Sequence, residues 1–364
     1  SIMNLVELFI AINSFFKGMG INSDNKIYLS IIAVIFILAI SSKLSKDKFT
    51  FKELGYLFSL VLIGIINYIV NNSSVILLTS LTLMLLKNMD INRCLKVMLI
   101  SRVLGYLTLA LGIVTGIIKQ QEIIMWRVNQ FIVRRTFNNI SPNSLQLNLV
   151  IIILLIIYLY RDKLNILEYV GMAIINYALY RYTFSRTGMV IGMLAIIMGY
   201  CITYLPVTKK WIMFLAKYSY IFLCIFSLGI SRLYNGGSLE ELDVLFNGRL
   251  SYMHALVSGY RIPFFGMNKS YFTNINIDNG FIDLLYVGGA VAFLIISYLI
   301  ISESNILYKE KDYYSLMIIL LMSIYSLSES FLPNIFINIS LFFLAWQIYK
   351  VPKEKTVNKI KNAK

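Results

Sequence analysis

The sequence is poor in the residues that build metal sites, disulfide frameworks and turns. It has one histidine, three cysteines and five prolines in 364 residues, and charged residues make up only 14%. A histidine-based metal site is therefore not expected. The cysteines are too widely spaced to indicate disulfides. No Gly-rich phosphate loop or nucleotide-binding fold is evident, so an enzyme with this sequence has to take a substrate that is already activated.

Apolar residues are what the sequence has in abundance, at 58% with a mean hydropathy of +0.74. They form blocks of about 14 to 22 residues, roughly the length that a helix needs to cross a ~30 Å hydrocarbon layer. This pattern predicts an all-α polytopic membrane protein of about twelve transmembrane helices. The predicted helices are residues 2–16, 27–42, 53–70, 74–87, 97–118, 147–160, 165–183, 187–205, 211–232, 281–301, 313–328 and 333–349.

The lysines predict the orientation of the chain. Most of them lie in the short polar breaks on one side of this map, together with a Lys-rich tail at residues 350–364. By the positive-inside rule both termini are cytoplasmic, and residues 1–349 form one transmembrane domain that the basic tail follows. The net charge of +15 then indicates contact with anionic lipid headgroups and not with nucleic acid.

Nearly all the arginines fall on the opposite, outer side of the map. They are Arg102, Arg127, Arg134, Arg135, Arg181, Arg186, Arg232, Arg249 and Arg261. Guanidinium groups recognise phosphate and carboxylate through paired hydrogen bonds, so their placement predicts an anionic ligand there. Two outer segments, 119–146 and 233–280, are too long for simple turns. The second is expected to form a cap with short helices between the ninth and tenth transmembrane helices.

Two motifs with arginine lie at the predicted outer ends of helices. Arg134 and Arg135 precede a Ser-Pro-Asn143 helix start, where an anion can bind at the helix N-terminus, although interfacial snorkelling also explains the pair. Ser185 and Arg186 lie between two helices with almost no loop. An ionisable residue at the membrane face is a functional candidate.

Two further motifs lie in or beside the large outer loop. Arg249 follows Asn-Gly248, and His254 comes five residues later, as either a packing residue or a base. Asp278 and Asn279 precede the helix that begins near residue 281, and either residue can cap it. Asp278 also places a carboxylate at the mouth of the bundle, where it can take a proton from a hydroxyl. Asp283, about one turn further on, is a secondary candidate.

Taken in order, the pieces "SPN", "SRTG", "NGRL" and "IDNGFIDLLYVGG" resemble the motifs of oligosaccharide repeat-unit polymerases. These are the Wzy-type enzymes of capsule, exopolysaccharide and O-antigen synthesis, in one superfamily with the O-antigen ligases. The resemblance is closest to polymerases of Gram-positive capsules. It implies a GT-C-like fold in the cell membrane and a metal-independent, inverting glycosyl transfer on the outer face, without a cofactor.

The resemblance also implies roles for particular residues. Arg186 and Arg249 match the arginines that hold the diphosphate of an undecaprenyl-diphosphate-linked repeat unit. Asp278 matches the position of the base, where the ligase branch commonly has histidine. The residues expected to contact substrate are Arg134, Arg135, Asn143, Ser185, Tyr252, His254, Tyr271 and Asn279. Membrane lipids and a chain-length regulator are the other expected partners.

Two expectations follow for the site as a whole, and two alternative functions stay open. Arg135, Arg186 and Arg249 are expected to face one anionic site, and Tyr252, Tyr260, Phe264 and Tyr271 are expected to stack on sugar rings. A flippase for lipid-linked oligosaccharides is the main alternative, because it also needs cations for a diphosphate. A secondary transporter is third, although the inverted repeats that it predicts are not found in the sequence.

Overall fold

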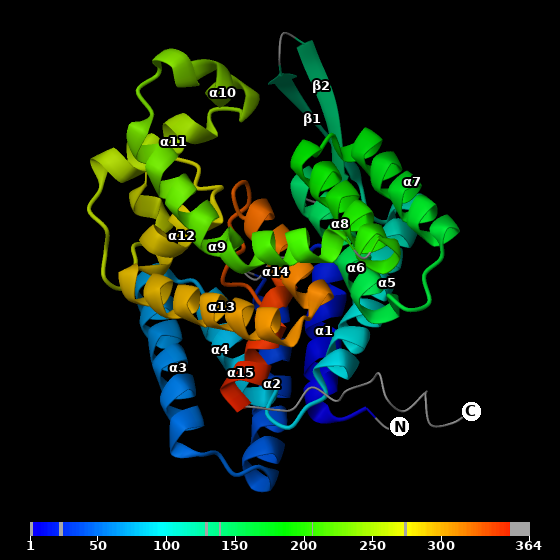
Figure 1. The fold of residues 1–364 in the computed structure, drawn as a ribbon, viewed down its shortest axis with the longest axis vertical. Helices are drawn as coiled ribbons and strands as arrows, with labels where there is room; N and C mark the ends of the chain where they lie inside the picture. Colours follow the sequence, from blue (N-terminus) through cyan, green and yellow to red (C-terminus); the bar gives the residue numbers. More distant parts are fainter. Residues whose placement is uncertain are drawn as a thin grey trace.

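The computed structural model describes residues 3–21, 25–127, 130–137, 140–205, 207–272 and 275–349, and helices dominate it (Figure 1). The main helices are α1 (Leu5–Gly18), α2 (Lys26–Lys46), α3 (Phe51–Asn71), α4 (Val75–Leu85), α5 (Ile91–Val114), α6 (Pro142–Tyr160), α7 (Ile166–Thr183), α8 (Arg186–Tyr204), α9 (Thr208–Leu233), α13 (Ala290–Glu310), α14 (Tyr313–Tyr325) and α15 (Leu344–Tyr349). The basic tail predicted for residues 350–364 lies outside the described residues.

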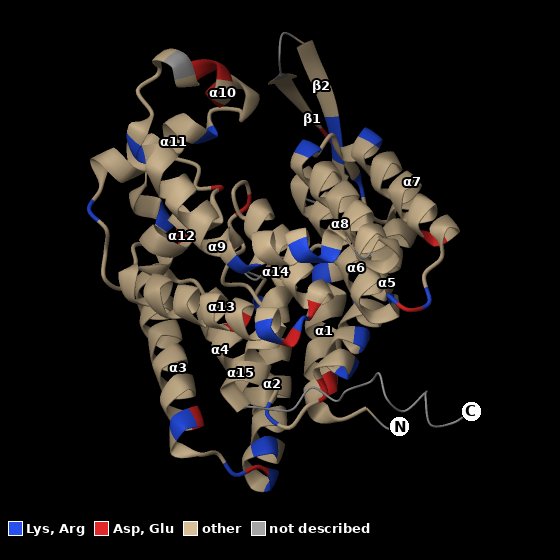
Figure 2. Cartoon of the chain, in the orientation of Figure 1, with Lys and Arg blue, Asp and Glu red and all other residues tan. Residues whose placement is uncertain are grey.

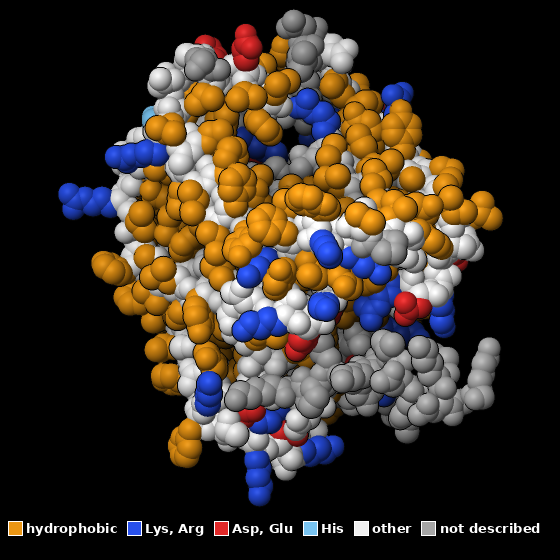
Figure 3. All heavy atoms as spheres, viewed as in Figure 1, with side chains coloured by type: hydrophobic (Ala, Val, Ile, Leu, Met, Phe, Trp, Pro, Cys, Tyr) orange, Lys and Arg blue, Asp and Glu red, His pale blue; other side chains and the backbone are white. Residues whose placement is uncertain are grey.

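Among the described residues, seven helices are long and apolar enough to cross a membrane: α2, α3, α5, α6, α8, α9 and α13. Several of them leave large apolar side chains exposed, such as Ile37 on α2, Phe58 on α3 and Phe222 on α9. Apolar side chains accordingly spread over much of the surface in Figure 3. Surface of this kind is stable in lipid and not in water, so the protein is a largely helical, multi-pass membrane protein.

Local side-chain chemistry sets where several helices begin and end. Thr50 and Glu53 form a reciprocal capping box at the start of α3, and Asn165 and Glu168 form another at the start of α7. Phe184 ends α7 in the left-handed conformation, with φ of 49°. Only two residues therefore separate the last turn of α7 from the first residue of α8.

The segment 119–146 contains strands, which the all-α prediction did not include. β1 (Gln120–Arg127) pairs with β2 (Gln130–Phe137) in an antiparallel hairpin, with Gln120 opposite Phe137. Branched and aromatic side chains are frequent in both strands, as suits a pleated surface. The hairpin projects beyond the ends of α6, α7 and α8 at the top of Figure 1.

The segment 233–280 forms the folded cap that the sequence predicts. It contains η1 (Gly237–Leu239), α10 (Glu240–Leu245), α11 (Arg249–Gly259) and η2 (Lys269–Tyr271). Leu250, Met253 and Leu256 of α11 pack with Phe272 and Tyr286 in an apolar cluster separate from the main core. The cap lies at the same end of the molecule as the hairpin, opposite the basic lower ends of α2 and α3 (Figure 2).

The helix predicted at 281–301 is broken near its start. α12 (Gly280–Asp283) runs into η3 (Leu284–Gly288), which has π-helical hydrogen bonding, and Gly289 with φ of 92° then ends the segment. A Cβ atom on Gly289 would lie 2.3 Å from the Gly266 nitrogen. The cap backbone thus docks against the break, and only glycine leaves room for it.

The helix predicted at 333–349 is irregular up to Asn338, followed by η4 (Ile339–Phe343) and α15. Side chains satisfy its free carbonyl groups: Thr79 donates to Pro333, at 2.6 Å, and Arg102 donates to Phe336. Arg102 is fully buried in the middle of α5 and also donates to Asn148 Oδ1, at 3.1 Å. It is therefore not a loop residue open to an anionic ligand, because it holds irregular backbone inside the protein.

Candidate functional site

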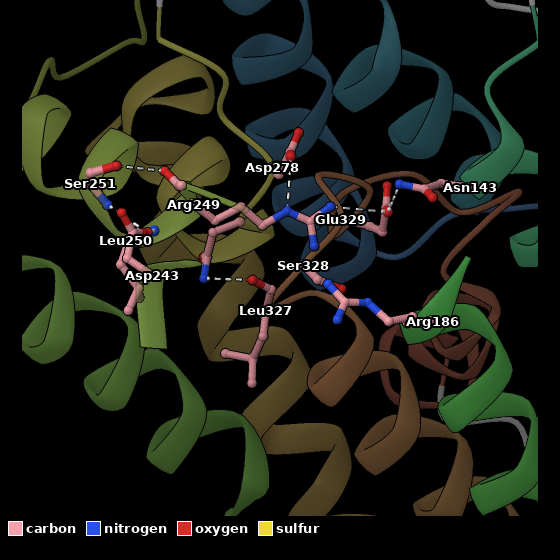
Figure 4. Close-up of polar contacts among 12 residues, drawn as sticks. Asn143, Arg186, Asp243, Arg249, Leu250, Ser251, Asp278, Leu327, Ser328 and Glu329 are labelled. Carbon is pink, nitrogen blue, oxygen red and sulfur yellow. Dashed lines mark hydrogen bonds and ion pairs between the residues drawn. The ribbon is translucent and has the colours of Figure 1, made fainter. Parts of the chain in front are cut away.

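Arg186 and Arg249 line one cavity of about 380 Å³ together with Asn143 and Ser185. One wall of the cavity is apolar and comes from α8 and α14, with Val190, Ile191, Leu194 and Ile324. The two arginines reach toward each other from opposite sides, with Ser328 between them (Figure 4). The space-filling view shows an opening with basic side chains at the same end, between the cap and the hairpin (Figure 3).

The position of Arg186 follows from the packing of the first turn of α8. Gly188 lies so close to α6 and α14 that a Cβ atom there would be 2.4 Å from Gln146 Cγ and 2.8 Å from Tyr325 Oη. The guanidinium of Arg186 donates to the Leu245 carbonyl at 3.0 Å, which ties α8 to the cap. Within the described part of the chain, no carboxylate lies within ion-pair distance of it. Arg186 thus brings an uncompensated positive charge to the cavity.

The position of Arg249 follows from a turn between two short helices of the cap. Asn247 and Gly248 both have positive φ, 55° and 78°, and α11 begins at Arg249. Asp243 Oδ1 accepts hydrogen bonds from the backbone N–H groups of Leu250 and Ser251, at 2.8 and 3.2 Å. The buried Asp243 carboxylate therefore caps α11 and fixes the direction from which Arg249 enters the cavity.

Arg249 is held between two carboxylates. Its Nε atom lies 3.0 Å from Asp278 Oδ2, and its Nη2 atom lies 3.8 Å from Glu329 Oε1. Glu329 Oε1 also accepts a hydrogen bond from Asn143 Nδ2 at 2.9 Å, and Asn143 Oδ1 accepts one from Arg134 Nη2 at 2.6 Å. A continuous chain of polar contacts thus joins the hairpin, α6, the segment after α14 and the cap. Figure 4 shows the part from Asn143 to Asp278.

Glu329 is the site residue that the sequence analysis missed. It belongs to no recognised motif, and it lies in the short break between two predicted helices. Burial raises the pKa of its carboxyl to about 7, although the positive charge of Arg249 opposes that rise. The available signal was an acidic side chain in a four-residue break on the same side of the map as the arginines.

Arg135 does not share the cavity of Arg186 and Arg249, contrary to the prediction. Its Nε atom lies 3.2 Å from Glu122 Oε1 across the hairpin, and it lines a separate cavity with Arg181 and Tyr182. Neighbouring residues of a strand point to opposite faces, so only one of the two adjacent arginines reaches α6. That residue is Arg134, which is buried and also donates to the Thr183 carbonyl at 2.9 Å.

The structure gives other predicted residues contacts outside this cavity. The Nδ1 atom of His254 lies 2.9 Å from the Ser231 carbonyl oxygen on α9, and Tyr234 packs against its ring. Tyr252 and Tyr271 are not among the described residues that line the cavity. Asn279 caps α12, accepting from Phe281 N at 3.0 Å, and so has the capping role that the sequence left open. Asp278 does contact the site, through Arg249.

Comparison with protein-family models, with curated proteins and with solved structures gave no match. Residues of all four sequence motifs meet at this site. Asn143, Ser185, Arg186 and Arg249 line the cavity, and Asp278 lies against Arg249. The first three motifs thus supply the lining, and the fourth supplies a carboxylate.

Proposed function

We propose that the protein is a polysaccharide polymerase that acts on the outer face of the cell membrane. It would transfer a growing glycan from undecaprenyl diphosphate to a hydroxyl at the non-reducing end of a lipid-linked repeat unit. The supporting observation is the convergence of Arg186 and Arg249 on one cavity, beside the carboxylates of Asp278 and Glu329. In this proposal both termini are cytoplasmic and about twelve helices cross or enter the membrane.

The lining of the cavity suits both parts of a lipid diphosphate, the isoprenoid chain and the diphosphate group. The apolar wall from α8 and α14 fits an isoprenoid chain, and the two guanidinium groups fit the diphosphate oxygens. Arg186 is available to an anion, and Arg249 exchanges a carboxylate contact for a phosphate contact when donor binds. As the glycosidic bond breaks, both arginines stabilise the negative charge that develops on the leaving diphosphate.

The proposed reaction is a direct displacement at the anomeric carbon of the donor sugar. The acceptor hydroxyl oxygen bonds to that carbon, and the bond to the diphosphate oxygen breaks with its electron pair on the diphosphate. The hydroxyl proton passes to Asp278, whose side chain is 44% exposed and 3.0 Å from Arg249. Glu329, at 21% exposure, is the more enclosed carboxylate and serves to position Arg249.

The test is glycan synthesis by the purified protein in liposomes that contain lipid-linked repeat units. The native protein is expected to produce a ladder of longer glycans. Arg186→Ala and Arg249→Ala are each expected to lower the rate about 10²- to 10³-fold, as for loss of a group that stabilises a developing anion. Arg135→Ala is the matched control, because that arginine lies in another cavity, and it is expected to retain activity.

Two outcomes would count against the polymerase. If both arginine variants build full-length polymer in cells that lack the native enzyme, the roles given to Arg186 and Arg249 are wrong. If the native protein moves a labelled lipid-linked repeat unit across the liposome membrane without lengthening it, the protein is a flippase instead.

A further inference from the structure

A second cavity, of about 290 Å³, opens where the end of α3 meets the start of α4. Its lining comes from four segments of the chain, and its polar residues include Asn71, Asn72, Ser73, Ser74, Lys269 and Ser330. The large outer loop contributes Lys269, and the segment after α14 contributes Ser330. These two segments also contribute residues to the arginine cavity.

The segment after α14 contributes to both cavities. Ser328 lines the arginine cavity, Ser330 lines the second cavity, and Glu329 lies between them in the chain. Asp283 of α12 also lines the second cavity. The segment that contains Glu329 therefore borders both cavities.

The linings of the two cavities differ in chemistry. The arginine cavity has two guanidinium groups and an apolar wall, whereas the second has amide and hydroxyl groups and no arginine among its described lining residues. Its one cation, Lys269, is paired with Asp283 at 2.8 Å. Clustered amides and hydroxyls without net charge are suited to the hydroxyl groups of an uncharged sugar.

Asparagine side chains hold the backbone at the back of the second cavity, and one hydrogen-bond acceptor there has no partner among the described residues. Asn67 Nδ2 donates to the carbonyl groups of Val287 and Gly288, at 2.9 and 3.1 Å, and Asn71 Nδ2 also donates to Val287. These bonds satisfy carbonyls at the end of η3, and π-helical segments are frequent at functional sites. Asn71 is only 8% exposed, yet its Oδ1 has no hydrogen-bond partner among the described residues. A buried free acceptor is costly unless a ligand hydroxyl satisfies it.

We propose that this second cavity binds the terminal sugar of the acceptor repeat unit, through Asn71, Asn72 and Ser330. The inference rests on the proposed polymerase function and assigns the two substrates to separate cavities. The lipid diphosphate of the donor occupies the arginine cavity, and the acceptor sugar occupies the second cavity, on the other side of the segment that contains Glu329. Asp278, beside Arg249, then takes the proton of the acceptor hydroxyl.

The test measures the binding of a lipid diphosphate and the binding of an oligosaccharide separately, on the full-length protein in detergent. One probe is undecaprenyl diphosphate without sugar. The other is the lipid-free oligosaccharide released by mild acid from the lipid-linked repeat units of the cell that makes this protein. The combined variant Asn72→Gly with Ser330→Ala is expected to weaken oligosaccharide binding about tenfold and to change undecaprenyl diphosphate binding less than about twofold. Arg186→Ala is expected to show the opposite pattern.

Glycine suits position 72 because Asn72 is left-handed, with φ of 55°, so only its amide is removed. Asn88→Gly is the matched control: Asn88 also has positive φ, 54°, but lies on the lysine-rich side, where it donates to Asp47 at 2.8 Å. Retained undecaprenyl diphosphate binding shows that the combined cavity variant and Asn88→Gly are folded.

Two outcomes overturn the inference while the proposed function stands. The first is unchanged oligosaccharide affinity in the cavity variant, with diphosphate binding still lost in Arg186→Ala. The second is a native protein that binds undecaprenyl diphosphate but not the oligosaccharide. If the native protein binds neither probe, the proposed function fails together with the inference.

Discussion

Arg249 has two carboxylates beside it before any substrate arrives. Asp278 lies 3.0 Å and Glu329 lies 3.8 Å from its guanidinium. A diphosphate that binds Arg249 has to replace at least part of this pairing. The strength of donor binding is therefore linked to the charge on Glu329, whose pKa burial raises to about 7.

The pH dependence of donor binding is the first prediction at the residue scale. Below about pH 7 Glu329 is protonated and no longer competes for Arg249, whereas above that pH it is ionised and does compete. Affinity for a lipid-linked sugar diphosphate, whose own charge is constant in this range, is expected to fall about 3- to 10-fold from pH 6 to pH 8. Binding titrations at the two pH values measure it.

Glu329→Gln is the variant that isolates this effect. Glutamine keeps the shape of the side chain and the contact with Asn143 but has no charge, so donor affinity is expected to be the same at both pH values. A Glu329→Gln protein with the same loss of affinity as the native protein would assign the titration to another group.

Sequence motifs were enough to locate some of these residues and not others. Arg186 and Arg249 were predictable, because an arginine beside a helix end or a glycine turn is distinctive in an apolar chain. Glu329 was not, because its role depends on Asn143 and Arg249, which are distant in the sequence. The choice between Arg134 and Arg135 depended on the face of a strand that was not predicted.

At the scale of elements, the packing of α8 against α6 and α14 holds the first turn that carries Arg186. Gly188→Ala would place a Cβ atom 2.4 Å from Gln146 Cγ. This overpacking is expected to destabilise the protein by about 1–3 kcal/mol and to displace Arg186. A thermal-stability assay in detergent, together with the polymerase assay, measures both effects.

Gly171→Ala in α7 is the matched control for Gly188→Ala. A Cβ atom at Gly171 would meet nothing within 4 Å. Alanine is the better helix former, so this variant is expected to be as stable as the native protein or about 0.5–1 kcal/mol more stable. Equal destabilisation by both substitutions would show that the tight contact at Gly188 has no special role.

The start of α11 gives a second prediction at this scale. Asp243→Ala removes the carboxylate that accepts hydrogen bonds from Leu250 N and Ser251 N, so the helix start is expected to loosen at a cost of about 0.5–2 kcal/mol. Because Arg249 is the first residue of α11, the polymerase rate is expected to fall about tenfold or more. Glu241→Ala, an exposed acidic residue on α10, is the control; a rate as low as that of Asp243→Ala would show that lost charge, and not lost capping, is responsible.

The elements that were predicted correctly are those with long, uniform apolar runs, such as α2, α3 and α9. Hydropathy does not separate a helix from the irregular backbone at 333–338, because the apolar residues there continue into the helix that follows. That segment is stable only because Thr79 and Arg102 reach it from other helices. The hairpin was missed because its sequence has no regular alternation of apolar and polar residues and lies in a segment interpreted as a loop.

At the scale of the whole molecule, the distribution of lysine and arginine predicts which end faces the cytoplasm. Cysteines introduced at Lys46 and Glu241 lie at opposite ends of the molecule, on α2 and α10. In intact cells that express a protein with Cys94, Cys201 and Cys224 replaced by alanine, a membrane-impermeant maleimide is expected to label Glu241→Cys and not Lys46→Cys. The reverse pattern would invert the topology and place the site inside the cell.

Composition alone was sufficient to predict a multi-pass helical membrane protein. It was not sufficient to predict the number of spans, because helices such as α4 and α14, of 11 and 13 residues, are apolar but shorter than a straight crossing needs. Whether such helices cross depends on how they pack against their neighbours.

The polar chain at the centre of the site also has a consequence for the order of synthesis. Asn143, Arg249, Asp278 and Glu329 emerge from the ribosome far apart in time. Arg249 can meet Asp278 soon after both are made, but Glu329 arrives only after α13 and α14 have been inserted. A chain that stops before residue 326 still contains both arginines and most of the apolar helices, yet it has no means of closing the cluster. Such a fragment is expected to enter the membrane and to have no activity.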